Sequence, residues 1–171
     1  MHREWLLIAA VGAFLTSACT FNVHVSAQAT VQGSGVPLVG NLLPIDFPGF
    51  SGLDLSQTEQ FKNQGVSKNQ VQSVKLTSAK LTITAPAGGT FDFLNDLEFD
   101  VGASNLPTKA IAGLSSIPQG ATELTLTVDD VELAPYVTAA SMNITTQAHG
   151  TPPQQDTTIS AALNFAVVPK I

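Results

Sequence analysis

Alternation of apolar and polar residues is the main structural signal in this chain. It is clearest near the start, over residues 21–32, and near the end, over residues 159–167, where every second residue is apolar. Successive side chains of a strand point to opposite faces of a sheet, so each stretch predicts a strand with one buried face. The inward residues of the last strand are expected to be Ile159, Ala161, Leu163, Phe165 and Val167.

The middle of the chain predicts further, shorter strands. In residues 71–86 the apolar positions change from even to odd numbers around Thr77 to Lys80, which indicates a bulge or a break between two strands. The next strand is expected to turn one face inward and a set of carboxylates outward. The inward residues are Phe91, Phe93, Leu97, Phe99 and Val101, and the outward ones are Asp92, Asp96, Glu98 and Asp100. Further strands are predicted over residues 109–114, 123–128 and 142–150.

Glycine and proline divide the chain between these strands. Turns are predicted at residues 87–90, 106–107 and 118–120, the last of them a hairpin-like connection. Residues 33–70 predict a loop with one short helix over residues 53–64, which ends at Gly65, and a further turn at residues 67–70. Within this loop, Phe47 and Phe50 either form an exposed apolar patch or close one end of the core.

About seven short strands with turns between them predict an all-β fold, an antiparallel β-sandwich that is immunoglobulin-like in general architecture. Residues 19–171 are long enough for a single domain with a core of its own.

The first 18 residues have a different pattern, which predicts a secretory signal peptide. Arg3 precedes an apolar run over residues 5–15, and the small residues Thr16, Ser17 and Ala18 follow it. As a helix the run would be about 16 Å long, against a hydrocarbon core of about 30 Å, so it is too short to span a bilayer.

The only cysteine of the chain, Cys19, directly follows this leader. The sequence Leu15-Thr16-Ser17-Ala18-Cys19 resembles the lipobox of bacterial lipoproteins, and the resemblance covers residues 1–19. It implies cleavage after Ala18, a diacylglycerol on the Cys19 sulfur and an acyl chain, typically palmitate, on the new amino terminus. Thr20 in place of an aspartate implies delivery to the outer membrane if the organism is Gram-negative. The alternative is ordinary secretory cleavage after Val25-Ser26-Ala27.

The charge balance excludes some partners. The chain has 13 acidic and 7 basic residues, and loss of Arg3 and Glu4 with the leader leaves 12 and 6. Nucleic acid is therefore not an expected partner. Anionic lipid headgroups would be repelled, so we expect the lipid anchor to hold the protein at the membrane.

Two acidic groups are candidates for calcium binding. Asp92, Asp96, Glu98 and Asp100 are predicted on one strand face, where alternate residues lie about 6–7 Å apart, so a solvated face is the preferred interpretation. The second group, at a strand end, consists of Asp129, Asp130 and Glu132.

His24 and His149 could bind a metal ion, or one of them could act as a base with Asp156, but neither lies in a recognisable motif. We therefore predict no catalytic residue, cofactor or metal, and Cys19 as the one site residue. The expected function is a lipid-anchored, non-enzymatic cell-envelope protein that binds or scaffolds an envelope protein or glycan. The alternatives are a calcium- or carbohydrate-binding, adhesin-like domain and a hydrolase with an unfamiliar site.

Overall fold

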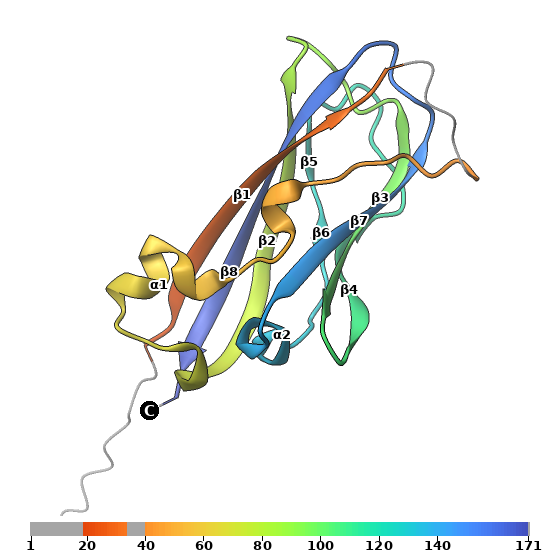
Figure 1. Ribbon diagram of the computed structural model, residues 1–171. Coiled ribbons are helices and arrows are strands. Elements are labelled where there is room, and N and C mark those ends of the chain that lie inside the picture. Colours follow the sequence, from red (N-terminus) through yellow and green to blue (C-terminus); the bar gives the residue numbers. More distant parts are fainter. Residues whose placement is uncertain (1–18, 34–39, 171) are drawn as a thin grey trace, which may run out of the picture.

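The computed structural model describes residues 19–33 and 40–170, which form two four-stranded antiparallel sheets (Figure 1). The first sheet has the order β1-β8-β2-β5 and the second the order β6-β4-β3-β7. The strands are β1 (Phe21–Val31), β2 (Val71–Ala85), β3 (Leu94–Ala103), β4 (Leu106–Leu114), β5 (Glu123–Thr125), β6 (Thr127–Val128), β7 (Met142–Gly150) and β8 (Thr157–Pro169). This arrangement confirms the predicted all-β antiparallel sandwich.

The first and last strands of the chain pair with each other and form the most regular part of the sheet. β1 and β8 run antiparallel from the Phe21–Val167 pair to the Val31–Thr157 pair without a register shift. The five inward residues predicted for β8 are all fully buried. On its other side β8 pairs with β2, where the register shifts between Leu76 and Ser78. The predicted change of inward face in this region is therefore a bulge within one strand.

β3 begins later than predicted. Phe91 and Phe93 are buried, but they lie in the turn that precedes Leu94, the first residue of the strand. The expectation of a solvated outer face was wrong for Asp100, which is only 4% exposed. Its carboxylate accepts a hydrogen bond from the Gln147 side chain of the neighbouring strand β7, and this bond satisfies the buried group.

Two turns differ from the prediction. The β3–β4 turn lies at Ser104 and Asn105, and Asn105 adopts a left-handed conformation with φ of 64°. Pro107 therefore lies within β4, close to a register shift, where the missing N–H group is tolerated. The segment around Gly120 is not a hairpin, because β4 and β5 belong to different sheets.

The strand predicted over residues 123–128 is divided between the two sheets at Leu126. β5 pairs with β2 in the first sheet, and β6 pairs with β4 in the second. Leu126 is buried at the crossing, and its N–H group donates to the carbonyl oxygen of Ala79. The helix α2 (Ala134–Thr138) follows and was not predicted.

The segment between β1 and β2 contains the predicted helix in two pieces, a 3-10 turn η2 (Leu55–Gln57) and the helix α1 (Glu59–Asn63). Gly65 follows α1 with φ of 63°, and a further 3-10 turn, η3 (Lys68–Gln70), confirms the expected turn. None of the helices in residues 19–33 and 40–170 is long and apolar enough to cross a membrane.

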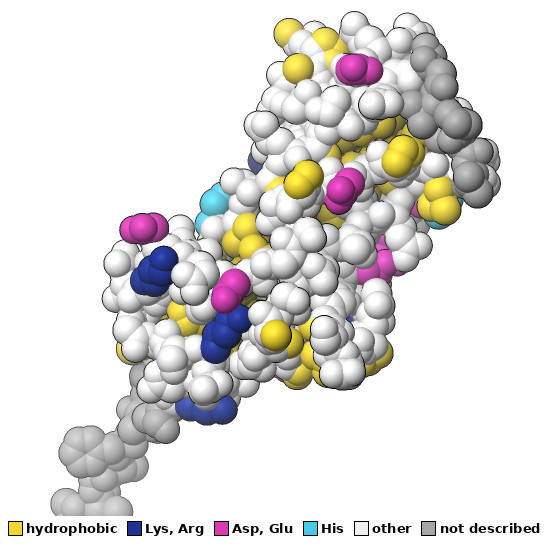
Figure 2. Space-filling view, in the orientation of Figure 1, with side chains coloured by type: hydrophobic (Ala, Val, Ile, Leu, Met, Phe, Trp, Pro, Cys, Tyr) yellow, Lys and Arg dark blue, Asp and Glu magenta, His cyan; other side chains and the backbone are white. Residues whose placement is uncertain are grey.

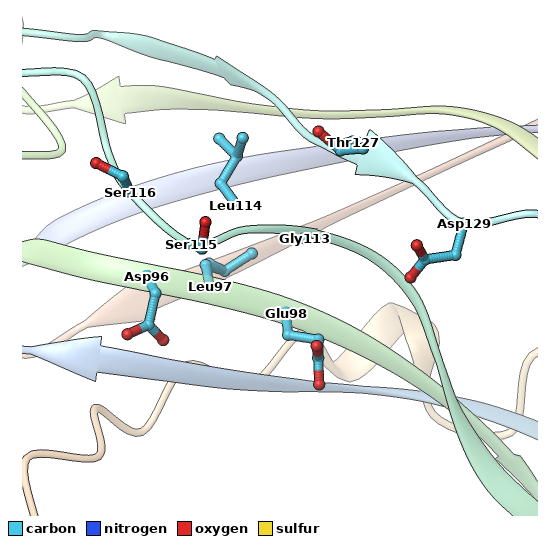
Figure 3. A pocket seen from close by; sticks show the side chains of 9 residues that line it. All are labelled: Asp96, Leu97, Glu98, Gly113, Leu114, Ser115, Ser116, Thr127 and Asp129. Carbon is cyan, nitrogen blue, oxygen red and sulfur yellow. The ribbon is translucent and has the colours of Figure 1, made fainter.

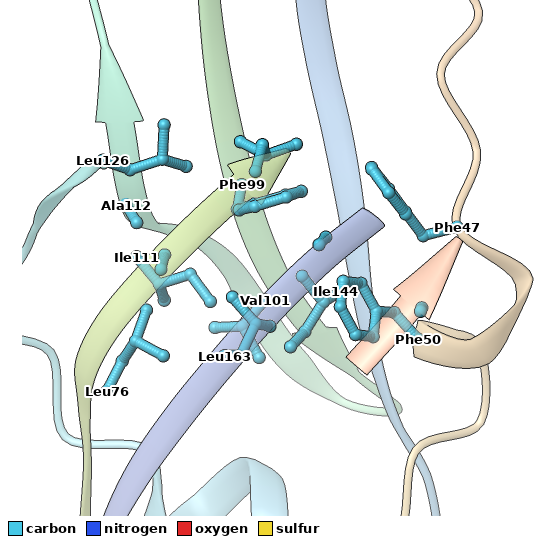
Figure 4. Packing of buried hydrophobic residues seen from close by; sticks show 14 of the residues in the cluster. Phe47, Phe50, Leu76, Phe99, Val101, Ile111, Ala112, Leu126, Ile144 and Leu163 are labelled. Atoms are coloured by element: carbon cyan, nitrogen blue, oxygen red, sulfur yellow. The ribbon is translucent and has the colours of Figure 1, made fainter. Parts of the chain in front are cut away.

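Phe47 and Phe50 belong to the core and do not form an exposed patch. Their exposed fractions are 2% and 0%, and both rings pack against Phe99 of β3, at centroid distances of 5.8 and 6.2 Å (Figure 4). Phe47 precedes and Phe50 ends a short 3-10 turn, η1 (Pro48–Phe50), which packs between β1 and β7. The loop thus closes the side of the sandwich where these two strands face each other.

Candidate functional site

Cys19 is exposed and lies two residues before the first strand. The strand begins with Phe21, which pairs with Val167 of β8 and places its ring 5.4 Å, edge to face, from the ring of Phe61 in α1. Cys19 therefore lies at the end of the sandwich where β1 begins and β8 ends (Figure 1). The predicted signal peptide, residues 1–18, lies outside the described residues, so its cleavage and the lipidation of Cys19 remain predictions.

Two acidic residues of β3, Asp96 and Glu98, line a pocket of about 540 Å³ on the outer face of the second sheet (Figure 3). Glu98 of β3 lies opposite Gly113 of β4, and Gly113 in turn lies opposite Thr127 of β6. Gly113, the middle residue of these three, has no side chain, and a Cβ atom at this position would lie 3.0 Å from the carbonyl oxygen of Leu97. Gly113 therefore forms the floor of the pocket.

Carboxylates dominate the charge of this acidic pocket. Asp96 and Glu98 come from β3, and Asp129 comes from the segment after β6. The pKa of Glu98 is raised above its usual value, first by burial and then by the negative charges of Asp100, Asp129 and Asp96. Over residues 19–33 and 40–170 the lysines that form ion pairs do so elsewhere: Lys68 with Asp54, Lys75 with Asp130 and Lys80 with Glu123.

The pocket does not reproduce either of the two acidic groups considered from the sequence. Asp92 lies in the turn before β3, where it accepts hydrogen bonds from the Gly120 N–H group at 2.6 Å and the Thr90 hydroxyl at 2.8 Å. These two bonds lower the pKa of Asp92. In the part of the chain that the structure describes, no three acidic, histidine or cysteine side chains lie close enough together to bind one metal ion.

Two members of the second acidic group have structural partners. Asp130 forms an ion pair with Lys75 at 2.7 Å. Glu132 accepts hydrogen bonds from the backbone N–H groups of Val74 and Ala134 and from the Ser73 hydroxyl. Glu132 therefore connects the start of α2 to β2, and only Asp129 of this group reaches the acidic pocket.

The structure does not bring the histidines together. His24 Nδ1 lies 2.9 Å from the Asn164 side-chain oxygen, and His149 Nδ1 lies 2.7 Å from a carboxylate oxygen of Asp96. Asp156 does not pair with His149; it accepts a hydrogen bond from the N–H group of Gly33.

Asp96 lies beside the His149 ring in the place that the orienting acid of a catalytic histidine base occupies. Ser115 and Ser116 line the acidic pocket near Asp96, but among the described residues no serine is hydrogen-bonded to His149. The arrangement lacks the nucleophile–base contact that hydrolysis of this type requires.

A second pocket, of about 430 Å³, lies at the end of the sandwich opposite Cys19. The turn after β2 and the segment between β7 and β8 line it, with mainly neutral residues. The sequence predicts a turn at residues 87–90, but the closeness of this turn to the segment between β7 and β8 depends on strand pairing.

Comparison of the chain with protein-family models, with curated proteins and with solved structures finds no match. Function is therefore inferred from the residues and their geometry.

Proposed function

We propose that this protein is a lipid-anchored component of a bacterial cell envelope and that it acts as a non-enzymatic binding or scaffolding module. The observation that carries the proposal is the lipobox-like sequence Leu15-Thr16-Ser17-Ala18-Cys19 immediately before the sandwich. The exposure of Cys19 supports it, because a lipidated sulfur must be accessible outside the folded core.

The position of Cys19 limits where the domain can lie. After the proposed cleavage only Cys19 and Thr20 would precede β1, and two extended residues span about 7 Å. Several acyl chains together form a firm anchor, since each buried methylene contributes about 0.8 kcal/mol. The sandwich would then be held against the bilayer surface. Thr20, in place of an aspartate, favours the outer membrane in a Gram-negative host.

Metabolic labelling with palmitate tests the anchor. Wild-type protein should incorporate the label and separate with the membrane fraction, while Cys19→Ala should do neither. Ser115→Cys on the Cys19→Ala background is the matched control, because it restores a cysteine at a different place. Equal labelling of wild type and Cys19→Ala would end the proposal, and labelling of the control would indicate nonspecific acylation.

A second candidate function is cation binding in the acidic pocket, in the manner of a calcium-dependent adhesin domain. The specific observation is that Asp96, Glu98 and Asp129 line one pocket; burial first, and then the neighbouring negative charges, raise the pKa of Glu98, and these charges would also attract a cation. It ranks second because Asp96, Glu98 and Asp129 do not form a compact ligand set.

Thermal unfolding with and without millimolar calcium tests this second function. A rise in melting temperature that Glu98→Gln reduces would support it. The control is Glu59→Gln, which removes one carboxylate from α1 and should leave the calcium response unchanged. No shift in the wild type would remove the metal-binding version.

A further inference from the structure

Charge is distributed unevenly along the sandwich. One end, which we name the anchor end, is where β1 begins, β8 ends and Cys19 lies. The helix α1 belongs to this end, because one of its rings lies 5.4 Å, edge to face, from the ring of Phe21, the first residue of β1. The turn η3 belongs to it because the backbone N–H group of Lys170, directly after β8, donates to the carbonyl oxygen of Gln70 at 2.6 Å.

Most of the lysines lie at or near the anchor end. Figure 2 shows several of their dark blue side chains gathered there, around α1. The anchor half of the sandwich consists of α1, α2, η2, η3 and the strand segments that adjoin them, and its lysines outnumber its carboxylates by one. The lysines are Lys62, Lys68, Lys75, Lys109 and Lys170, and the carboxylates are Asp54, Glu59, Asp130 and Glu132.

The other half of the sandwich is strongly acidic. Among the described residues it contains one lysine, Lys80, which forms an ion pair with Glu123 at 2.7 Å. Its carboxylates are Asp46, Asp92, Asp96, Glu98, Asp100, Glu123, Asp129 and Asp156. The net charge of −6 is therefore located in the half away from Cys19. An even distribution of this charge would repel anionic lipid headgroups at every face, but the observed distribution leaves the anchor end slightly positive.

We propose that the anchor end rests on the headgroups of anionic phospholipids, so that the sandwich stands upright with its acidic half away from the bilayer. The inference rests on the lipid anchor proposed above, because the two residues between the acyl chains and β1 would keep this end within about 7 Å of the surface. That distance is shorter than the Debye length of about 8 Å at physiological salt, so the charges of the anchor end interact with the headgroups. Each lysine near an anionic surface favours contact about fivefold.

Other orientations gain less from an anionic surface. With the outer face of the second sheet on the bilayer, Asp96, Glu98 and Asp129 of the acidic pocket would meet the headgroups and be repelled. On the outer face of the first sheet the lysines of β2 are balanced by ion pairs, so that face gains little from anionic lipid. The upright orientation also turns the pocket of about 430 Å³ at the opposite end away from the bilayer, where a partner can reach it.

Paramagnetic broadening of amide resonances tests the orientation. All eight strands follow Cys19, so a chain that begins at this residue keeps both sheets, and its single thiol can be coupled to a maleimide lipid. The coupled protein is placed on nanodiscs that contain a gadolinium-labelled headgroup in phosphatidylcholine, with or without phosphatidylglycerol. Phosphatidylglycerol should concentrate the broadening at α1, η3 and Lys170, whereas phosphatidylcholine alone should spread it along the first sheet.

Charge variants assign the effect to the lysines of the anchor end. Lys62→Gln and Lys170→Gln each remove one positive charge there, and each should reduce the preference for the upright orientation about fivefold. The matched control, Lys80→Gln, removes the same charge from the other half and should not reduce this preference. Salt at about 1 M, where the Debye length is about 3 Å, should remove the difference between the two lipid compositions.

The same broadening pattern in both lipid compositions, or the strongest broadening near Asp92 and Asp156, would overturn the proposal. An unchanged pattern in both the Lys62→Gln and the Lys170→Gln variants would overturn it as well. Because the coupling to lipid is chemical, it anchors the protein whether or not a cell acylates Cys19. The orientation and the proposed function can therefore fail separately.

Discussion

The carboxylate of Glu132 connects α2 to the first sheet, and its removal is the most informative stability test in this protein. One oxygen accepts from the N–H groups of Val74, at 2.8 Å, and Ala134, at 2.9 Å. The other accepts from the Ser73 hydroxyl at 2.7 Å. Val74 is fully buried, so its N–H group has little access to water once the carboxylate is removed.

The expected loss can be estimated from these bonds. A hydrogen bond to a charged group contributes about 1.5–3 kcal/mol net, and an unsatisfied buried donor costs about 1–3 kcal/mol. Because Glu132 is itself exposed and water can reach part of the site, we expect Glu132→Ala to lower the free energy of unfolding by about 2–4 kcal/mol. Glu132→Gln keeps one acceptor oxygen and should lose about half as much.

The effect should depend on pH. Burial acts to raise the pKa of Glu132, but the hydrogen bonds from Ser73, Val74 and Ala134, together with the charge of Lys75, lower it below 4.5. Since the pKa of Glu132 is lower in the folded state than in the unfolded state, the ionised carboxylate stabilises the fold above pH 4.5. This stabilisation is lost as the pH falls through the folded-state pKa of Glu132. The difference between wild type and Glu132→Ala should therefore be largest at neutral pH.

Urea unfolding at pH 7 and at pH 3 measures both effects. The control is Glu123→Ala, because Glu123 and Lys80 form an ion pair in which both side chains are 47% exposed, and such pairs contribute at most about 1 kcal/mol. If Glu132→Ala lowers the stability no more than Glu123→Ala does, the assignment of Glu132 as a connection between α2 and β2 is refuted.

Three further changes test the acidic pocket, the core and a close backbone approach. Glu98→Gln should raise the free energy of unfolding at pH 7. The pKa of Glu98 is raised in the folded state, so the wild type loses stability as the pH rises from 4.5 through the folded-state pKa, and the glutamine variant does not. Urea unfolding across that pH range checks this. Phe50→Ala should cost about 3–5 kcal/mol by the same assay, since the ring is fully buried, and a loss below about 1 kcal/mol would contradict its place in the core. Gly150→Ala places a methyl group directly against the Phe93 carbonyl oxygen and should lower the melting temperature strongly, whereas Gly102→Ala, with its nearest atom 3.6 Å away, should change it far less.

The sequence predicts the long strands well because their side chains alternate over many residues with one face buried. β1 and β8 satisfy this condition along their whole length, and so their faces were predicted correctly. The same rule failed over residues 123–128. The alternation continues through Leu126 while the backbone passes from one sheet to the other, and side-chain periodicity contains no information about which sheet a strand joins.

The helix α2 was missed for a different reason. It has only five residues, too few to show a helical period, although Pro135 in its first turn is a recognised start signal. Its position depends on contacts with distant parts of the chain. Tyr136 donates a hydrogen bond to the carbonyl oxygen of Pro107, and Glu132 connects its start to β2.

The acidic pocket shows how far prediction of a site from the sequence can reach. Asp96 and Glu98 were expected to point outward from one strand, but Asp129 joins them only because β3, β4 and β6 are neighbours. The hollow between them depends on Gly113, whose register opposite Glu98 and Thr127 is set by pairing across three strands. Residue types thus indicated where negative charge would lie, whereas the shape of the pocket follows from the order and register of the strands. The pocket therefore depends on pairing between residues that are far apart in the sequence, and this pairing is set only when the whole domain folds.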